Sequence, residues 1–401
     1  MIFQTGLELL LNNSKLQAHL KNKRVALLAH PASVCQNLTH ALDALKQKNI
    51  NIVAAFGPQH GIQGEKQDNM VESQDFIHPQ YHIPIFSLYG ENGRHLTAQM
   101  LQSFDVLLID LQDLGCRIYT FLTTMCYVLQ DCAQHQKSVW ILDRPNPAGR
   151  RIEGLTLEKG FESFVGIDAI PMRYGLTLAE MADFYIKRHR LQIDFNLLLM
   201  KNYAPNNAPL FGWVSRPWIN PSPNAASLNM ARLYAGTVLL EGTNLSEGRG
   251  TTRPLECMGA PALDLKAILK RMETINPNVF HGILVRECFF EPTFHKHAGQ
   301  LCTGLFLHTD FDHFQIDAFS PFRFVATFLK AVFQTHQELP LWRKFVYEYE
   351  REKLPIDIIN GSCFLREWVE NPSATFDDLH QKLIQDENAW QETQRQFLLY
   401  A

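Results

Sequence analysis

Short apolar runs alternate with helix-like stretches through the first 145 residues of the chain. The runs are rich in Val, Ile, Leu and Phe and are apolar on both faces, as buried parallel strands usually are. They are RVALLAH (24–30), NIVAAF (51–56), IPIFSLY (83–89), DVLLIDL (105–111) and SVWILD (138–143). Helix-like stretches lie between most of them, at residues 37–48, 97–103 and 119–134. This β-α-β-α order predicts an α/β fold built on a doubly wound parallel sheet, with helices on both faces.

The next part of the chain predicts longer connections. Thr177 and Glu180 form a capping-box pattern, which predicts a helix that runs to about Arg188. Residues 201–223 are rich in Pro and Asn and predict a long loop. Residues 236–254 predict a strand followed by a polar, glycine-rich loop.

The C-terminal part mixes helical and short extended patterns. This mixture predicts a second, smaller α+β domain. We therefore expect an N-terminal domain at residues 1–260, which carries most of the candidate site, and a C-terminal domain at residues 261–401.

Polar side chains follow the predicted strands. In open α/β sheets, ligands bind outside the carboxyl ends of the strands. The residues at these ends are His30, Gln59, His60, Asp110, Asp113, Arg144 and Asn146. Asp and Asn also cap helices, and Gly and Pro make turns, so a single residue of this set decides little. Together they favour a polar ligand at this edge of the sheet.

The densest polar segment comes later, in residues 241–253. It carries Glu241, Asn244, Glu247 and Arg249 directly after an apolar run. A ligand with many hydroxyl groups would account for this density, and a solvated surface loop is the alternative. The segment lacks the lysine of a phosphate-binding loop, and no G-x-G-x-x-G follows the first strand, so a nucleotide site is not expected.

Residues 57–70 form a second candidate segment. Its glycines let the backbone approach a ligand, His60 could move a proton, and Glu65 supplies a carboxylate. A metal site from His60, Asp110 and Asp113 lacks ligand spacing, so no metal is expected. A serine nucleophile is not expected either, because the chain has no G-x-S-x-G. The segment His295-Lys296-His297 is expected at the surface rather than in a site.

Composition excludes several classes of function. Net charge is -4 over 401 residues, with no charged block that would recruit nucleic acid or an anionic membrane. The chain contains no run of about 18 apolar residues, and its N-terminus does not resemble a signal peptide. Its eight cysteines are scattered and form no C-x-x-C pair, which favours buried free thiols in a reducing compartment. We therefore expect a cytoplasmic protein that neither binds nucleic acid nor inserts into a membrane.

Several long segments of the chain are distinctive when they occur together and in this order. They are FGPQHGIQG (56–64), PIFSLYG (84–90), DVLLIDLQDLGCRIYTFLTTM (105–125), LDRPNPAGRRIEG (142–154), PSPN (221–224), LLEGTNLSEGRGTTRPLECMGAP (239–261) and PIDIINGS (355–362). Together they resemble a known family, the NamZ-type exo-β-N-acetylmuramidases, formerly catalogued as a domain of unknown function. The resemblance covers nearly the whole chain. It implies a Rossmann-like N-terminal domain, a smaller C-terminal domain and an active site in the cleft between them. It also implies removal of N-acetylmuramic acid from the non-reducing end of peptidoglycan fragments, as in cell-wall recycling, without a cofactor.

One position departs from the family pattern. The family's usual loop is similar to GPEHG, whose glutamate is its proposed catalytic carboxylate, and this chain has Gln59 there. An amide cannot act as a general acid or base. Another carboxylate could supply the proton, the 2-acetamido group of the substrate could act as nucleophile, or the protein could bind the glycan without cleaving it.

The resemblance and the strand-end pattern together define the candidate site. The expected catalytic residues are Glu65, Glu247, Asp113 and His60. The expected substrate-binding residues are Gln59, Asp110, Arg117, Tyr119, Arg144, Asn146, Glu153, Asn224, Glu241, Asn244 and Arg249. The arginines are candidates for the lactyl carboxylate, because a guanidinium binds carboxylates bidentately. The partner is a small glycan or muropeptide; the alternatives are a non-catalytic sugar-binding protein and a hydrolase for another amino sugar.

Overall fold

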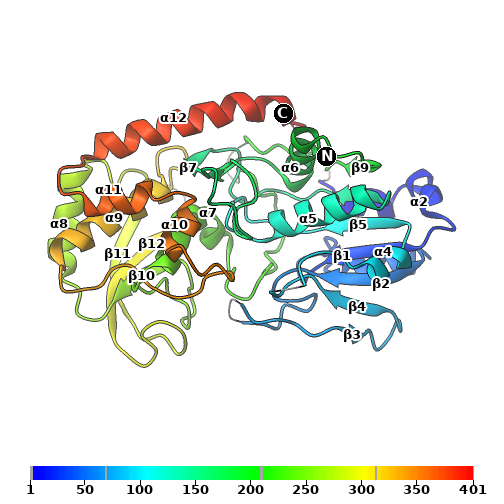
Figure 1. Ribbon diagram of the computed structural model, residues 1–401, viewed down its shortest axis with the longest axis horizontal. Helices are drawn as coiled ribbons and strands as arrows, with labels where there is room; N and C mark the ends of the chain where they lie inside the picture. Colours follow the sequence, from blue (N-terminus) through cyan, green and yellow to red (C-terminus); the bar gives the residue numbers. More distant parts are fainter. Residues whose placement is uncertain (1–2, 68–69, 92, 208–210, 312–313, 401) are drawn as a thin grey trace.

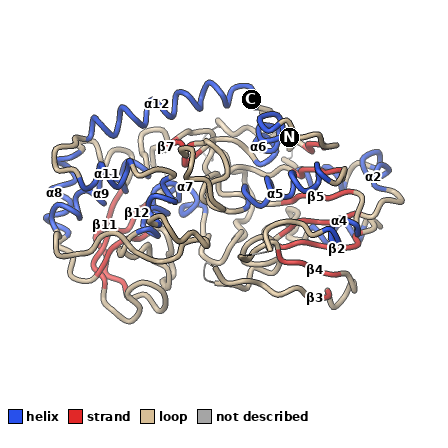
Figure 2. Tube along the Cα trace, viewed as in Figure 1, coloured by secondary structure: helices blue, strands red, loops and turns tan. Residues whose placement is uncertain are grey.

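The chain folds into two lobes joined by one long helix (Figure 1). The computed structural model describes residues 3–67, 70–91, 93–207, 211–311 and 314–400. One lobe surrounds a seven-stranded sheet and the other a three-stranded sheet. Figure 2 shows the two sets of strands well separated, with loops filling much of the region between them.

The larger sheet has the order β3-β4-β2-β1-β5-β6-β9. All neighbouring pairs are parallel except β3 with β4. The strands are β1 (Val25–Ala29), β2 (Ile52–Gly57), β3 (Phe76–Ile77), β4 (Pro84–Ser87), β5 (Val106–Asp110), β6 (Ser138–Leu142) and β9 (Phe195–Leu198). The five strands predicted from the apolar runs are therefore confirmed. From β1 the chain adds β2 and β4 on one side of the sheet, and then β5, β6 and β9 on the other side. The order of the strands therefore reverses between β1 and β5, which is where an open α/β sheet places its ligand crevice.

Both faces of this sheet are covered. Along β1, Val25, Leu27 and Ala29 belong to one apolar cluster, whereas Ala26 and Leu28 belong to another, as the alternation of side chains along a strand requires. The first cluster includes residues of α1 (Gly6–Leu11), α2 (Ser14–Leu20) and α3 (Ala41–Gln47). The second includes residues of α4 (Ala98–Ser103), α5 (Phe121–Gln134) and α6 (Leu178–His189). The doubly wound α/β fold is thus confirmed, and α6 begins at the predicted capping box of Thr177 and Glu180.

The smaller sheet is antiparallel, with the order β10-β12-β11. Its strands are β10 (Cys257–Ala260), β11 (Leu284–Phe290) and β12 (Cys302–His308). The helices of this lobe are α7 (Leu228–Thr237), α8 (Leu265–Ile275), α9 (Pro321–Thr335), α10 (Pro355–Asn360) and α11 (Phe364–Glu370). The second domain is therefore α+β, as expected. The domain boundary between residues 260 and 261 stays a prediction. Strand β10, which ends just before this boundary, belongs to the small sheet of the second lobe.

The strand predicted at the start of residues 236–254 is wrong. The structure has the end of α7 there, followed by a 3₁₀ helix, η1 (Val238–Gly242). Leu239 and Leu240 are fully buried, so the run is apolar on every side and shows no helical period. At Gly236 an added Cβ would lie 2.1 Å from the carbonyl oxygen of Pro321, so α7 passes very close to the start of α9.

Helix α12 (Phe376–Gln394) connects the two lobes, as Figure 1 shows. Near its end, Trp390 Nε1 donates to the carbonyl oxygen of Tyr174 at 2.8 Å and Gln394 Nε2 donates to that of Gly175 at 2.9 Å. Nearer its middle, Asp386 accepts a hydrogen bond from the backbone of Thr156 in β7 (Glu153–Thr156), which pairs with β8 (Pro171–Arg173). The second apolar cluster also runs through both lobes. The lobes therefore share one continuous core.

The eight cysteines are all free thiols, and six of them are buried, in agreement with the interpretation of their spacing. Among the described residues, no helix is both long and apolar enough to cross a bilayer. The same part of the chain contains no group of three or more His, Cys, Asp or Glu side chains arranged to hold a metal ion.

Candidate functional site

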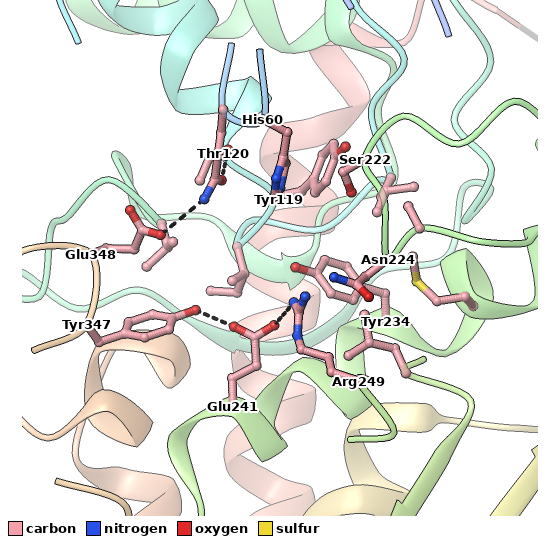
Figure 3. Close-up of a pocket in the computed structure, with 17 residues that line it drawn as sticks. His60, Tyr119, Thr120, Ser222, Asn224, Tyr234, Glu241, Arg249, Tyr347 and Glu348 are labelled. Carbon is pink, nitrogen blue, oxygen red and sulfur yellow. Dashed lines mark hydrogen bonds and ion pairs between the residues drawn. The ribbon is translucent and has the colours of Figure 1, made fainter. Parts of the chain in front are cut away.

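A small cavity lies between the two lobes. Its polar lining comes from both (Figure 3). The lining polar residues are Gln59, His60, Tyr119, Thr120, Ser222, Asn224, Tyr234, Glu241, Arg249, Tyr347 and Glu348. Six of the residues predicted from the sequence are in this set: Gln59, His60, Tyr119, Asn224, Glu241 and Arg249.

The loop after β2 supplies one wall of the cavity. His60 has φ of 73° and the next residue, Gly61, has φ of 81°, so the chain turns sharply at the end of the strand. His60 Nδ1 lies 2.6 Å from the carbonyl oxygen of Lys66, a contact that fixes the orientation of the ring. Gln59 accepts a hydrogen bond from the Thr120 hydroxyl at 2.7 Å, which fixes its amide orientation. Strand β2 thus places two polar side chains at the predicted edge of the sheet.

Glu348 comes to the cavity from the other lobe. It belongs to residues 343–354, which we call the strap and which precede α10 in Figure 1. The Gln59 amide donates to Glu348 Oε1 at 3.4 Å, the Tyr89 hydroxyl lies 3.1 Å from both carboxylate oxygens, and the Arg94 guanidinium lies 3.2 Å from Oε2. Burial raises the pKa of Glu348 to about 7, and the charge of Arg94 opposes this rise. The carboxyl group can therefore hold or release a proton near neutral pH.

Glu241 is a second carboxylate of the cavity, in a different environment. The guanidinium of Arg249 donates to Glu241 Oε1 at 2.6 Å, and the Tyr347 hydroxyl donates to Oε2 at 2.8 Å. Figure 3 shows Glu241 between Tyr347 and Arg249, with Glu348 at the left of the view and Asn224 and Ser222 at the right. Both carboxyl groups thus pair with an arginine, and burial raises the pKa of Glu348 to about 7. Glycosidases use two carboxyl groups of this kind in different roles.

Glu247 lies outside the lining of this cavity, in a buried ion cluster. Its carboxylate is 2.5 Å from Lys296 Nζ and 3.2 Å from Arg249 Nε. Burial opposes ionisation of Glu247, but the nearby charges of Lys296, His295 and Arg249 outweigh it and lower the pKa. A carboxylate held ionised is a poor proton donor. Lys296 is buried, so the expectation that residues 295–297 lie at the surface is wrong for this lysine.

Two of the predicted arginines bind groups of the protein itself. Arg144 forms a two-point ion pair with Asp110, at 2.6 Å and 2.8 Å, and both side chains are buried. Arg117 is fully buried and donates to four backbone carbonyl oxygens, those of Leu155, Ile170, Ile359 and Asn360. The structure therefore places both arginines in internal contacts rather than in the cavity lining.

Three further predicted substrate-binding residues make similar internal contacts. Asn146 donates to the Leu176 carbonyl at 2.8 Å, and Asn244 donates to that of Pro340 at 2.5 Å. Glu153 is buried and accepts from the Ser320 hydroxyl at 2.5 Å.

Asp113 is buried and accepts from the backbone of Gly115 at 2.7 Å and from the Tyr174 hydroxyl. Burial raises its pKa to about 6, and the Tyr174 contact opposes the rise. Glu65 is exposed and lies 3.8 Å from Lys66. The catalytic roles predicted for Asp113, Glu65 and Glu247 stay predictions, and their positions outside the cavity lining weaken all three.

Comparison with known proteins covers nearly the whole chain. A sequence model for the N-terminal part of exo-β-N-acetylmuramidase NamZ matches residues 25–229, and one for its C-terminal part matches residues 232–400. The chain belongs to the exo-β-N-acetylmuramidase NamZ family. The peptidoglycan β-N-acetylmuramidase NamZ of Bacillus subtilis strain 168 is 34% identical to it over 402 residues, which cover 99% of this chain and 91% of that protein.

Solved structures show the same fold as this NamZ-family chain. Two crystal structures of DUF1343 family proteins from Bacteroides fragilis NCTC 9343 superpose with TM-scores of 0.83 and 0.74, at 25% and 26% identity. Each comparison covers 100% of this chain and 99% of the other. The resemblance read from the sequence motifs is therefore confirmed.

The NamZ-family cavity also contains residues that the sequence did not indicate. Glu348 and Tyr347 lie in the strap, more than 80 residues after the last candidate loop. Glu348 and Tyr349 have φ of 49° and 69°, which residues other than glycine rarely adopt, and no local pattern announces that geometry. Thr120 and Ser222 lie inside two of the segments that carry the resemblance, and Tyr234 lies shortly before a third, so these segments were the available signal.

Proposed function

We propose that the protein is a glycoside hydrolase that removes N-acetylmuramic acid from the non-reducing end of peptidoglycan fragments. The observation that supports this most is a cavity between the lobes that holds two carboxyl groups, Glu241 paired with Arg249 and Glu348, which burial makes protonatable near neutral pH although it pairs with Arg94. Hydrolysis of a glycosidic bond needs both a proton donor and stabilisation of an oxocarbenium-like transition state. The family and the naming of the Bacillus subtilis relative support the same reaction.

The side chains that line the cavity suit a sugar. The aromatic faces of Tyr119 and Tyr234 can pack on the sugar, and Asn224 can bind its acetamido or hydroxyl groups.

Arg249 is the cavity's candidate for the lactyl carboxylate of N-acetylmuramic acid. Its guanidinium lines the cavity and already contacts Glu241 and Glu247. A guanidinium presents five N–H donors, so one group can bind several carboxylates at once. Glu241 then stabilises positive charge that develops on the sugar ring. The reaction needs no cofactor, and we place it in cell-wall recycling in the cytoplasm, consistent with the free thiols.

The test is release of N-acetylmuramic acid from a synthetic aryl β-N-acetylmuramide by the purified protein. We expect the wild-type protein to release it, and an aryl β-N-acetylglucosaminide, which lacks the lactyl group, to react much more slowly. Gln59→Glu is assayed beside it. Release only by Gln59→Glu would identify a glycan-binding protein instead, and silence of both proteins would refute the proposed reaction.

Substitution at Arg249 separates recognition of the lactyl group from general damage. Arg249→Lys keeps a positive charge beside Glu241 but loses the fork of donors. We expect KM for the muramide to rise while the slow reaction with the glucosaminide changes little. An equal loss on both glycosides would place Arg249 outside lactyl recognition.

A further inference from the structure

We propose that Glu348, supplied by the strap, is the general acid that protonates the leaving oxygen of the glycosidic bond. This inference rests on the proposed function and names the residue that carries its central step. The C1–O bond breaks with its electron pair on the leaving oxygen, which takes the proton of Glu348. Water then adds its oxygen to C1 and returns one proton to the carboxylate, directly or through solvent, so the group is ready for another turnover.

The first support is position. Glu348 lines the cavity together with Gln59 and His60, the residues that follow β2 at the ligand-binding edge of the sheet. Gln59 occupies the family's glutamate position but cannot itself transfer a proton. Its amide nitrogen points instead at Glu348 Oε1, 3.4 Å away, while its oxygen is occupied by Thr120. Position 59 thus orients a carboxyl group that another part of the chain provides.

The second support is the rigid setting of this carboxyl group. Glu348 is 5% exposed, although it comes from a loop. Arg94 pairs with it and stacks over the ring of Phe164, 3.9 Å from its centroid. The strap is tied to the first lobe at two more points, by Tyr349 to Glu72 and by an exposed Arg351–Glu91 pair. A fixed acid costs little reorganisation when the substrate reacts.

The third support is the balance of charges around Glu348. Burial raises its pKa, and the charge of Glu241 on η1 contributes in the same direction. Arg94 and the hydroxyl of Tyr89, both from the region after β4, oppose the rise. The groups that face this carboxyl are Gln59, Tyr89, Arg94, Glu241, Tyr347 and Tyr349. A carboxyl poised near neutral pH suits a group that must donate and then recover a proton.

The decisive experiment compares two leaving groups in the Glu348→Gln variant. A 2,4-dinitrophenyl β-N-acetylmuramide loses its aryl oxide without needing a proton, whereas N-acetylmuramyl-β-1,4-N-acetylglucosamine must have its leaving alkoxide protonated. We expect kcat/KM for the disaccharide to fall by about 10²–10⁴-fold, the usual contribution of a general acid. Activity on the dinitrophenyl glycoside should stay within about tenfold of wild type. Glu352→Gln, the same substitution at an exposed glutamate of the strap, is the matched control and should leave both rates unchanged.

The pH profile gives a second readout that a purely structural role would not alter. Wild-type kcat/KM on the disaccharide should fall as the pH rises through about 7, because Glu348 must be protonated to donate. Arg94→Leu removes the positive charge that favours the carboxylate, so this falling limb should move to higher pH; Arg94→Lys should leave it nearly in place.

Each outcome decides the assignment. Equal losses on both substrates in folded Glu348→Gln, or no loss on either, would overturn Glu348 as the acid while leaving the glycosidase function intact. A wild-type protein that cleaves neither muramide would overturn both. Circular dichroism and thermal melts of each variant exclude the case in which the strap has unfolded.

Discussion

Substitution of Arg117 tests whether this residue binds the substrate or stabilises the fold. The sequence placed it among the candidates for the lactyl carboxylate, but its two terminal nitrogens donate to four carbonyl oxygens at 2.7–3.1 Å. Two of those carbonyls, from Ile359 and Asn360, are at the C-terminal end of α10, where a cation is favoured by the helix dipole. Arg117→Met keeps most of the apolar stem and removes all four contacts.

Two opposing contributions set the change in unfolding free energy: the lost hydrogen bonds and the relieved cost of burying the guanidinium. A hydrogen bond to a charged group contributes about 1.5–3 kcal/mol, so four would contribute about 6–12 kcal/mol. Removing the guanidinium also removes its burial cost, several kcal/mol. The expected net loss of unfolding free energy is therefore about 3–5 kcal/mol, as for other broken buried charge contacts. With an unfolding entropy of about 2.1 cal/mol/K per residue, or about 0.8 kcal/mol/K over 401 residues, Tm should fall by about 4–6 °C.

The test compares thermal melts and steady-state kinetics of the wild-type protein and the Arg117 variants, measured on the same preparations. Because the apolar core is continuous through both lobes, we expect one cooperative transition, shifted downward in Arg117→Met. The KM for the muramide at 25 °C should stay within about twofold of wild type. Arg117→Lys, which keeps the charge but reaches fewer carbonyls, should lose about half as much stability. An unchanged Tm with a raised KM would refute the structural account and restore Arg117 as a substrate-binding residue.

Three further perturbations test other parts of the fold. Lys296→Met leaves Glu247 without its closest counter-charge and should lower the free energy of unfolding, measured with denaturant, by about 3–5 kcal/mol. Adding Glu247→Gln should recover part of that loss, and strictly additive losses would contradict the pairing. Gly236→Ala should lower Tm, since the new Cβ meets the Pro321 carbonyl at 2.1 Å, and an unchanged Tm would show that α7 can move away from α9. Burial raises the pKa of Asp143 to about 7, so its protonated form is favoured in the folded state. Its contribution to stability should be complete below about pH 4 and should be lost as the pH rises from about 4 through 7. In Asp143→Asn, the denaturation midpoint should depend less on pH over this interval. An unaltered pH dependence would assign the effect to other groups.

The large sheet was predictable because its strands are covered on both sides. Strand β1 has five consecutive buried apolar residues, so its apolar run needs no tertiary information to be recognised. The same reasoning failed at residues 238–242, where a 3₁₀ helix is also buried on every side. An apolar run reports burial, and burial alone does not distinguish a strand from a short helix.

The candidate site was predictable only in part, for a related reason. Gln59 and His60 could be placed because the fold class fixes where β2 ends. Residue type cannot show whether a polar side chain binds a ligand or the protein, and Arg144 and Asn146 are bound internally. Glu348 depends on the closure of one lobe against the other, a long-range event with no local signature in the sequence.

The bridge made by α12 also affects how this chain is assembled during synthesis. Trp390 contacts the backbone of Tyr174 from 216 positions further along, and Tyr400 donates to the Asp143 carboxyl group at 2.5 Å from 257 positions away. The first lobe therefore leaves the ribosome without the partners that complete its surface around α6. Chaperones that shield exposed apolar patches have a defined interval in which to act, and it ends when α12 is made. A premature stop before residue 376 would thus damage the lobe synthesised first as well as the lobe that lost its helix.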